Sequence, residues 1–422
     1  MNNTNVEMTD IRTPDTQMAG APAAHPHAVA GRHAMAHPHA AGLQPTGGGR
    51  PSYTKDDFAF SPFVLFYEVT RACDLACKHC RACAQPKPHA MQLSTHMAQM
   101  LLEEIASFPK PPLLVFTGGD PMKREDIFDL VSCAVDLRLT TAMTPSATPL
   151  VTRAAINQLK DAGLARLAVS MDGIDAATHD GFRGVAGSFD RTLEIMRNSR
   201  EVGLPQQVNT TITPANVHQV DEMAEMLSKE NIVLWSVFFL VPVGRGLAQD
   251  RITPMQYEEV FGKLWEHSKS KPYAIKTTEA PHYRRFVLNR SDNPQKEASG
   301  FAPGSIRRAP LGVVDGKGVM FVSHTGGIYP SGFMPLRCGH FPEESIIDVY
   351  QKSEWMMKLR DSDLLHGKCG VCEHRHSCGG SRARAYAVTG DPLGAEPDCV
   401  HVPTAWKAAA EGKTASTGIA AA

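Results

Sequence analysis

Three cysteines form the part of this sequence best suited to chemistry. Cys73, Cys77 and Cys80 lie on one short loop, with the spacing CxxxCxxC, directly after the apolar run 63–69. Thiols spaced in this way can point into one small volume, and thiolate sulfur is a soft ligand that suits iron–sulfur clusters or zinc. A cubane has four irons, so three protein thiolates leave one iron free to bind a molecule that reacts. The loop therefore predicts a catalytic cluster.

Two other interpretations of this loop stay open. Zinc would need a fourth ligand near the three thiols, and His79, between two cysteines, cannot easily turn inward. Cys80 and Cys83 also form a CxxC pair of the kind used for thiol redox chemistry or zinc binding. By count, Cys77, Cys80 and Cys83 are a second possible ligand triplet.

At these residues the sequence resembles a known family. A CxxxCxxC loop after a first strand is similar to the signature of the radical S-adenosylmethionine (radical SAM) enzymes. The resemblance implies that Cys73, Cys77 and Cys80 hold a [4Fe–4S] cluster whose free iron binds the amino and carboxylate groups of S-adenosylmethionine. An electron from the cluster then cleaves S-adenosylmethionine to methionine and a 5'-deoxyadenosyl radical. Iron–sulfur clusters reach the low potentials that this step needs.

Composition limits the classes of protein. A length of 422 residues with 42% apolar composition suffices for a core and for more than one domain. The net charge of -1 gives no indication of a nucleic acid partner. Ten cysteines, without a secretory segment or a long apolar span, predict metal ligation in a reducing cytoplasm and no membrane span. Residues 1–52, rich in Ala, His and Pro, and residues 404–422 are predicted to be disordered tails.

Residues 53–288 are predicted to form an α/β domain. Short β-rich runs alternate with amphipathic segments there. Strands are expected at 63–69, 113–117, 140–144, 167–171, 207–212 and 233–241, and helices at 95–108, 188–202 and 254–267. Six β/α repeats imply a parallel sheet with helices outside. The resemblance selects a partial (β/α)6 TIM-like barrel. Residues 289–312, interrupted by Asn, Ser, Pro and Gly, are predicted to be a linker or lid.

Candidate residues for the nucleoside follow the predicted strands, at the edge where ligands bind in parallel sheets. The second strand is followed by Gly118, Gly119, Asp120 and Pro121. This GGDP sequence resembles the family's GGEP motif, whose backbone and acid hold the amino group of S-adenosylmethionine, with Asp in place of Glu. The resemblance further implies that Ser170 and Arg183 contact its carboxylate, and that Asn209 and the segment 241–244 lie where the family contacts ribose and adenine.

Two adjacent arginines are candidates for the substrate. Arg284 and Arg285 follow the predicted barrel and precede the predicted lid. A pair of guanidinium groups suits a substrate carboxylate. The alternative is a solvated, charged start of a helix.

A second group of cysteines lies in the predicted C-terminal domain, residues 313–403, after a hairpin expected at 319–323 and 327–330. Its members are Cys369, Cys372, Cys378 and Cys399. Four thiolates can close a site completely, which suits an electron-transfer or structural cluster, or zinc. The order resembles the SPASM/twitch extension of radical SAM enzymes. Ser331 and Arg382 stand where that pattern has cysteines, so we expect one auxiliary cluster and two [4Fe–4S] clusters in all. Cys338 is a possible substitute ligand.

The resemblance implies an enzyme that abstracts hydrogen from a substrate and takes electrons from a low-potential donor of ferredoxin or flavodoxin type. The segments 331–335 and 378–387 are close to the haem-biosynthesis branch, whose members act on tetrapyrrole side chains. Other SPASM relatives modify ribosomal peptides, so a small molecule and a peptide both remain possible substrates. A non-enzymatic iron–sulfur or zinc scaffold is the alternative of a different class. GGDP and Ser170 favour the enzyme, because a scaffold needs no nucleoside site.

Overall fold

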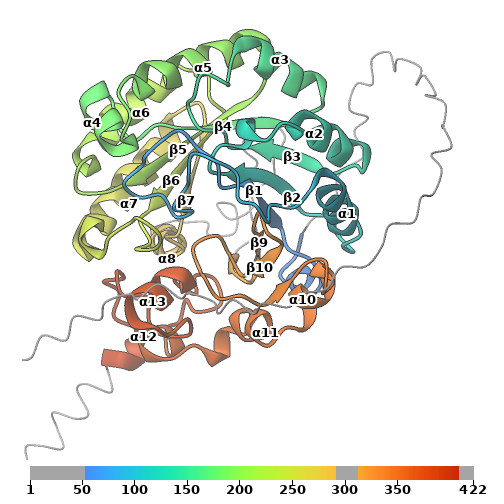
Figure 1. Cartoon of the computed structure of the whole chain (residues 1–422). Coiled ribbons are helices and arrows are strands. Elements are labelled where there is room, and N and C mark those ends of the chain that lie inside the picture. Colours follow the sequence, from blue (N-terminus) through green and yellow to red (C-terminus); the bar gives the residue numbers. More distant parts are fainter. Residues whose placement is uncertain (1–52, 291–311, 408–422) are drawn as a thin grey trace, which may run out of the picture. The chain divides into compact units, whose positions relative to one another are not determined.

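A parallel sheet runs through most of the chain (Figure 1). The computed structural model describes residues 53–290 and 312–407. Seven strands pair in sequence order, each parallel to the next. They are β1 (Val64–Thr70), β2 (Leu113–Gly118), β3 (Thr140–Met143), β4 (Arg166–Ser170), β5 (Gln206–Ile212), β6 (Leu234–Phe239) and β7 (Ala274–Thr278).

Helices join these strands and cover the outer face of the sheet (Figure 1). They are α1 (Thr95–Ala106), α2 (Ile127–Asp136), α3 (Arg153–Asp161), α4 (Ala176–Arg183), α5 (Ser188–Val202), α6 (Val220–Ser228), α7 (Pro254–Ser270) and α8 (His282–Leu288). Side-chain caps begin several of them: the Thr253 hydroxyl accepts from the Gln256 amide at the start of α7. Short 3-10 turns lie at Asp56–Ala59, Pro121–Lys123, Val217–Gln219, Ala248–Asp250 and Ser362–Leu364.

The main core lies between the sheet and these helices. Alternate strand residues, such as Leu65, Leu167 and Val208, are buried there against the helices. Because side chains alternate along a strand, the intervening residues face the opposite side. We call that side the inner face. It carries, among others, Phe66, Glu68, Thr117, Ala142, Arg166, Ser170, Asn209, Ser236 and Lys276.

The C-terminal region joins the same sheet. Its strands are β8 (Val314–Asp315), β9 (Gly318–Val322), β10 (Gly327–Tyr329) and β11 (Gly339–His340), and its helices are α10 (Ile346–Lys352), α11 (Glu354–Arg360), α12 (Gly367–Gly370) and α13 (Arg382–Thr389). β9 is parallel to β1, with Val319 opposite Val64, and β10 is antiparallel to β9. The sheet therefore has eleven strands. The predicted hairpin is confirmed, and the predicted domain boundary at 313 stays a prediction.

The predicted partial barrel is confirmed, with one strand more than expected. The six predicted strands and three predicted helices end within three residues of the observed bounds. The seventh parallel strand, β7, escaped prediction because Lys276 interrupts its short apolar pattern. The predicted tail 1–52 and nearly all of the segments 289–312 and 404–422 lie outside the described residues. None of the helices that the structure describes has the length and apolar character needed to cross a membrane.

Candidate functional site

The loop after β1 gathers the three predicted cluster cysteines. Cys73 and Cys77 are buried and pack with Leu75 and Ala84, and Cys80 packs against this group. The amides of Leu75 and Ala84 donate to the sulfurs of Cys73 and Cys80, at 3.3 and 3.5 Å. Burial raises the pKa of the Cys73 thiol, and the neighbouring Cys77 raises it further. Three soft donors supported by amide N–H groups fit an iron–sulfur cluster.

The neighbours of Cys80 do not supply an obvious fourth ligand. The His79 ring stacks on Phe182, with ring centroids 4.1 Å apart and planes 9° apart. Burial lowers the pKa of His79 to about 3, so the ring is neutral and held by packing. Cys83 adopts a φ of 46° after its amide donates to the Cys80 carbonyl at 3.3 Å. The ligand set of Cys73, Cys77 and Cys80 stays a prediction that this geometry favours.

Glycines let other loops press against the cysteine loop. A Cβ at Gly118 or Gly119 would clash with the carbonyl oxygens of Thr70 or Ala72. The amides of Gly119 and Asp120 donate to those same two oxygens, at 2.8 and 2.7 Å. The GGDP motif is therefore built against the backbone that leads into Cys73. This is a second reason for its glycines, besides the predicted approach to S-adenosylmethionine, which stays a prediction.

The loop after β6 holds the other side of the cysteine loop. A Cβ at Gly244 would clash with the carbonyl oxygen of Cys80. The Arg245 amide donates to the Cys80 carbonyl at 3.0 Å, and its Nε donates to the Cys77 carbonyl at 2.8 Å. The segment 241–244, predicted from the resemblance to contact the nucleoside, thus begins a loop that also positions the thiols.

The Asp120 carboxylate organises the loop after β3. It is fully buried and accepts from the Thr148 hydroxyl at 2.7 Å and from the Ser146 and Met122 amides at 3.2 Å each. Burial raises its pKa, against the lowering effect of these donors. Its contact with the ammonium of S-adenosylmethionine stays a prediction. Ser146 was not found from sequence, because no motif marks the Ser/Thr/Pro-containing loop that carries it.

Arg183 lies beside the thiols. It forms a buried ion pair with Asp172, and its Nη1 is 3.8 Å from the sulfur of Cys77. Burial raises the pKa of Asp172, but the charge of Arg183 brings it below its usual range. Asp172 in turn accepts from the Thr211 amide at 2.7 Å. The predicted contact of Arg183 with the carboxylate of S-adenosylmethionine stays a prediction.

Ser170 and Asn209 lie side by side on the inner face. They are paired in register at the end of β4 and the middle of β5. The Asn209 carbonyl oxygen accepts from Gln207 Nε2 at 2.7 Å, which orients its amide. The structure thus brings the predicted residues of β4 and β5 together, and their ligand stays a prediction.

The four C-terminal cysteines line a single pocket, the auxiliary pocket. The amides of Glu396, His374 and Gly380 donate to the sulfurs of Cys369, Cys372 and Cys378, at 3.3, 3.4 and 3.5 Å respectively. Burial raises the thiol pKa to about 12 for Cys378 and to about 11 for Cys399. Such thiols stay neutral until a metal displaces their protons. Cys338 lies elsewhere, with its thiol donating to the Leu336 carbonyl at 3.5 Å.

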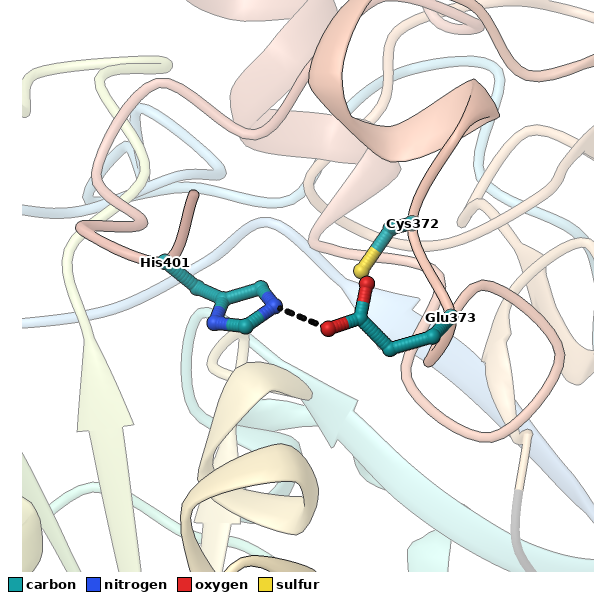
Figure 2. Close-up of side chains that lie close together, drawn as sticks. All are labelled: Cys372, Glu373 and His401. Atoms are coloured by element: carbon teal, nitrogen blue, oxygen red, sulfur yellow. Dashed lines mark hydrogen bonds and ion pairs between the residues drawn. The ribbon is translucent and has the colours of Figure 1, made fainter. Parts of the chain in front are cut away.

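Cys372 and His401, which line the auxiliary pocket, form a second donor set with Glu373 (Figure 2). Ligand atoms of Cys372, Glu373 and His401 all lie within 4.8 Å of one another. His401 Nε2 is 3.0 Å from a carboxylate oxygen of Glu373. Mixed sulfur, nitrogen and oxygen donors suit zinc. The pocket therefore offers ligands for an iron–sulfur cluster, through its four cysteines, and for zinc, through the mixed set.

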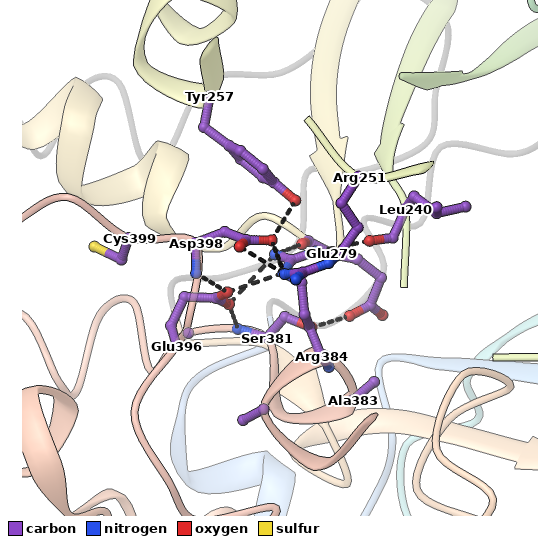
Figure 3. Close-up of polar contacts among 12 residues, drawn as sticks. Leu240, Arg251, Tyr257, Glu279, Ser381, Ala383, Arg384, Glu396, Asp398 and Cys399 are labelled. Carbon is purple, nitrogen blue, oxygen red and sulfur yellow. Dashed lines mark hydrogen bonds and ion pairs between the residues drawn. The ribbon is translucent and has the colours of Figure 1, made fainter. Parts of the chain in front are cut away.

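Two buried arginines of α13, Arg382 and Arg384, support the pocket, and Figure 3 shows the contacts of Arg384. Arg384 Nε contacts the carboxylates of Glu396 and Asp398, at 2.9 and 3.2 Å, and its Nη2 donates to the carbonyl of Glu279, which follows β7. Arg382 donates to the Gly394 carbonyl at 2.6 Å, and its Nη2 lies 3.9 Å from the sulfur of Cys369. Arg382 thus places a guanidinium, and not a ligand, beside the cysteines.

The arginines predicted for substrate have protein partners. Arg285 pairs with the Glu258 carboxylate and lines the auxiliary pocket. Arg284 donates to the Val313 carbonyl at 2.8 Å. Their role in binding a substrate carboxylate stays a prediction.

Comparison with known proteins places the chain in a family. The model of the radical SAM superfamily matches residues 67–228. The chain is 37% identical over 368 residues to the AdoMet-dependent heme synthase of Nitratidesulfovibrio vulgaris, covering 86% of this chain and 98% of the relative. The chain belongs to the radical SAM superfamily. It is also 36% identical over 343 residues to an AdoMet-dependent heme synthase of Methanosarcina barkeri, covering 81% of this chain and 97% of that one.

The fold agrees with a solved structure that contains bound S-adenosylmethionine. Streptococcus suis SuiB bound to S-adenosylmethionine matches with a TM-score of 0.63 and 16% identity, over 81% of this chain and 78% of that chain. The partial barrel with a cysteine-rich C-terminal region, like that of SPASM enzymes, is thereby confirmed. The chain is a radical SAM enzyme, whose cofactors include S-adenosylmethionine and a [4Fe–4S] cluster, and such enzymes require a reductant.

Proposed function

We propose that this enzyme forms a haem from a tetrapyrrole precursor: a propionate side chain of the ring loses a hydrogen atom to the 5'-deoxyadenosyl radical, then releases carbon dioxide and one electron, and becomes a vinyl group. The observation that carries the proposal is the extent of the likeness to the two heme synthases. At 37% and 36% identity, the alignments cover 98% and 97% of those relatives. The likeness is therefore not confined to the part of the barrel that all radical SAM enzymes share.

The thiols of Cys73, Cys77 and Cys80 are proposed to hold the catalytic cluster. When bound, that cluster supplies the electron that splits S-adenosylmethionine into methionine and a 5'-deoxyadenosyl radical. The chain's own residues position the reactants: GGDP and the loop after β6 fix the cysteine loop, and Ser170 and Asn209 offer polar groups to the nucleoside from the inner face. The Arg183–Asp172 pair keeps a positive charge beside Cys77.

Cys369, Cys372, Cys378 and Cys399 are proposed to hold one auxiliary [4Fe–4S] cluster. Four thiols complete the coordination of such a cluster, so it would transfer electrons and not bind substrate. When bound, it supplies a route for the electron that leaves the substrate after hydrogen abstraction. The hydrogen bond from Arg384 of α13 to the carbonyl of Glu279 links this pocket to the end of β7.

The electron donor is proposed to be a ferredoxin or flavodoxin. All ten cysteines are free thiols in the structure, which supports the proposal that the enzyme works in a reducing cytoplasm.

The test uses the full chain after anaerobic reconstitution with iron and sulfide. It is incubated with S-adenosylmethionine, a low-potential reductant and iron-coproporphyrin III, a tetrapyrrole whose side chains carry carboxylates. We expect a haem product by mass spectrometry, with 5'-deoxyadenosine formed in proportion. An unchanged porphyrin, beside 5'-deoxyadenosine that forms equally without it, would refute the tetrapyrrole assignment while leaving the radical chemistry intact.

A further inference from the structure

Two cationic side chains share the inner face with the candidate nucleoside residues. Lys276 of β7 is aligned with Ser236, which is aligned with Asn209. Arg166 begins β4, and Ser170 ends it. The strand neighbours Leu167 and Ile275 are buried in the core under the helices. Alternation along the strands therefore places Arg166 and Lys276 inside the barrel.

Arg166 is buried without a carboxylate partner among the residues that the structure describes. Its side chain is 5% exposed, and its single hydrogen bond within the described residues joins Nη1 to the neutral Gln207 Oε1 at 3.4 Å. Its buried Nε has no acceptor there. Burial lowers the pKa of Arg166 to about 10, still far above neutrality, so the guanidinium is charged. A buried charge with unfilled donor positions is unfavourable unless an anion completes it.

Lys276 is accessible to water and yet surrounded by protein. Its side chain is exposed, but burial among protein groups lowers its pKa to about 8, and the nearby charge of Arg166 lowers it further. An exposed side chain and a pKa lowered by surrounding protein occur together when the group faces an enclosed space that water can reach. In residues 53–290 and 312–407, Lys276 has neither an ion pair nor a hydrogen bond.

Other buried arginines that the structure describes pair with acids or, like Arg382, donate to several backbone carbonyls. Arg183 pairs with Asp172, Arg285 with Glu258 and Arg384 with Glu396. The contrast with Arg166 and Lys276 indicates that these two cations await an external anion. Along β4, Arg166 lies four residues before Ser170, about 13 Å away at the usual rise of a strand. It is thus distant from the carboxyl end of β4, where S-adenosylmethionine is proposed to bind.

We propose that Arg166 and Lys276 bind carboxylate side chains of the tetrapyrrole, an assignment that rests on the proposed function. Arg166 offers planar paired donors and Lys276 a mobile point charge. Gln207 accepts from Arg166 and donates to Asn209 at 2.7 Å, so it joins the carboxylate site to the candidate nucleoside site.

The rest of the inner face suits the body of such a ligand. On β1, β2 and β9 the inner face is largely apolar, with Phe66, Val115 and Phe321 aligned or adjacent in register. On β5 to β7 it is polar, and the hydroxyls of Ser236 and Thr278 lie 3.1 Å apart. A flat apolar ring with carboxylates along one side could place the ring against the apolar strands and the carboxylates against the polar strands.

The experiment compares coproporphyrin III with its tetramethyl ester, which lacks the charges, by fluorescence titration of the reconstituted full chain. We expect wild type to prefer the acid. Lys276→Met and Arg166→Gln should each weaken binding of the acid by about tenfold or more and leave binding of the ester unchanged. Lys276→Arg should restore the preference. Lys263→Met, which removes a partly exposed lysine paired with Asp221, is the matched control.

Two outcomes overturn the assignment, and they are distinguishable. If wild type binds neither porphyrin, both the proposed function and the carboxylate site fail. If wild type prefers the acid and both variants keep that preference, the function stands and only the assignment of Arg166 and Lys276 fails. Binding of S-adenosylmethionine, measured on each variant, reports whether the barrel is folded. For a variant that is not folded, Lys276→Gln and Arg166→Lys provide the decisive titration.

Discussion

The hydroxyl of Ser146 lies 3.3 Å from the sulfur of Cys73. It also donates to the Gly119 carbonyl at 2.9 Å, and Asp120 fixes its position by accepting from the Ser146 amide. The free Cys73 thiol can donate a hydrogen bond to the Ser146 hydroxyl. A metal-bound thiolate has no proton, so the Ser146 hydroxyl would instead donate its hydrogen bond to the sulfur. Burial raises the pKa of Cys73, and the hydroxyl opposes that rise. The acid of GGDP is thus linked to a candidate cluster ligand through a single serine.

Removing the Ser146 hydroxyl should make the catalytic cluster harder to reduce. Hydrogen bonds to ligand sulfur favour the reduced, more negative cluster, so Ser146→Ala should shift the reduction potential to a more negative value and slow cleavage of S-adenosylmethionine several-fold. The potential is measured by redox titration followed by electron paramagnetic resonance. Ser146→Thr keeps the hydroxyl and should keep the potential. An unchanged potential in the alanine variant would show that the contact is only structural.

The cluster ligands are tested by single substitutions. Cys73→Ala, Cys77→Ala and Cys80→Ala should each abolish formation of 5'-deoxyadenosine, because each removes one cap of the cluster. Cys83→Ala is the matched control in the same loop and should retain cleavage. Activity retained in Cys73→Ala, with loss in Cys83→Ala, would favour the alternative triplet of Cys77, Cys80 and Cys83.

Metal content distinguishes the two interpretations of the auxiliary pocket. Reconstituted wild type should contain about eight iron and eight sulfide per chain, as expected for two cubanes. The triple variant Cys73→Ala, Cys77→Ala, Cys80→Ala should keep half of each. If zinc remains in place of that iron, and is lost in His401→Ala, the site is the mixed donor set of Cys372, Glu373 and His401.

Local patterns predicted the barrel well, whereas contacts between distant residues could not be predicted. Apolar periodicity located six strands, and it failed at β7, where an inward lysine interrupts the run. Cysteine spacing named both thiol groups. Nothing local marks Ser146, which matters because a loop 73 residues away in sequence brings a thiol to it. Arg166 and Lys276 likewise look ordinary until the register of β4 to β7 places them on one face.

The stability of the connection between β7 and α13 should depend on pH through Glu279. Burial raises the pKa of Glu279 to about 8, with a further contribution from Asp315, and its carboxyl group receives a hydrogen bond from Ser381. The folded pKa exceeds the unfolded one, so this contribution is full below about pH 4.5 and is lost as the pH rises through about 8. Glu279→Gln should therefore equal wild type in apparent Tm near pH 5 and exceed it near pH 9. A constant difference across that range would contradict the raised pKa.

The buried pair of Arg384 and Glu396 should hold the auxiliary pocket together. Arg384 is fully buried and neutralises the carboxylates of Glu396 and Asp398, while the Glu396 amide donates to the sulfur of Cys369. Arg384→Met leaves the Glu396 carboxylate without its counter-charge, which for a buried pair costs about 3–5 kcal/mol, while Asp398 keeps its ion pair with Arg251. We expect a lower apparent Tm and selective loss of the auxiliary iron, measured by iron analysis and electron paramagnetic resonance, with the signal of the cluster at Cys73, Cys77 and Cys80 retained. The double variant Arg384→Met, Glu396→Gln removes a charge of each sign and should recover part of the stability. Equal loss of both clusters would mean that the pair supports the whole fold and not the pocket alone.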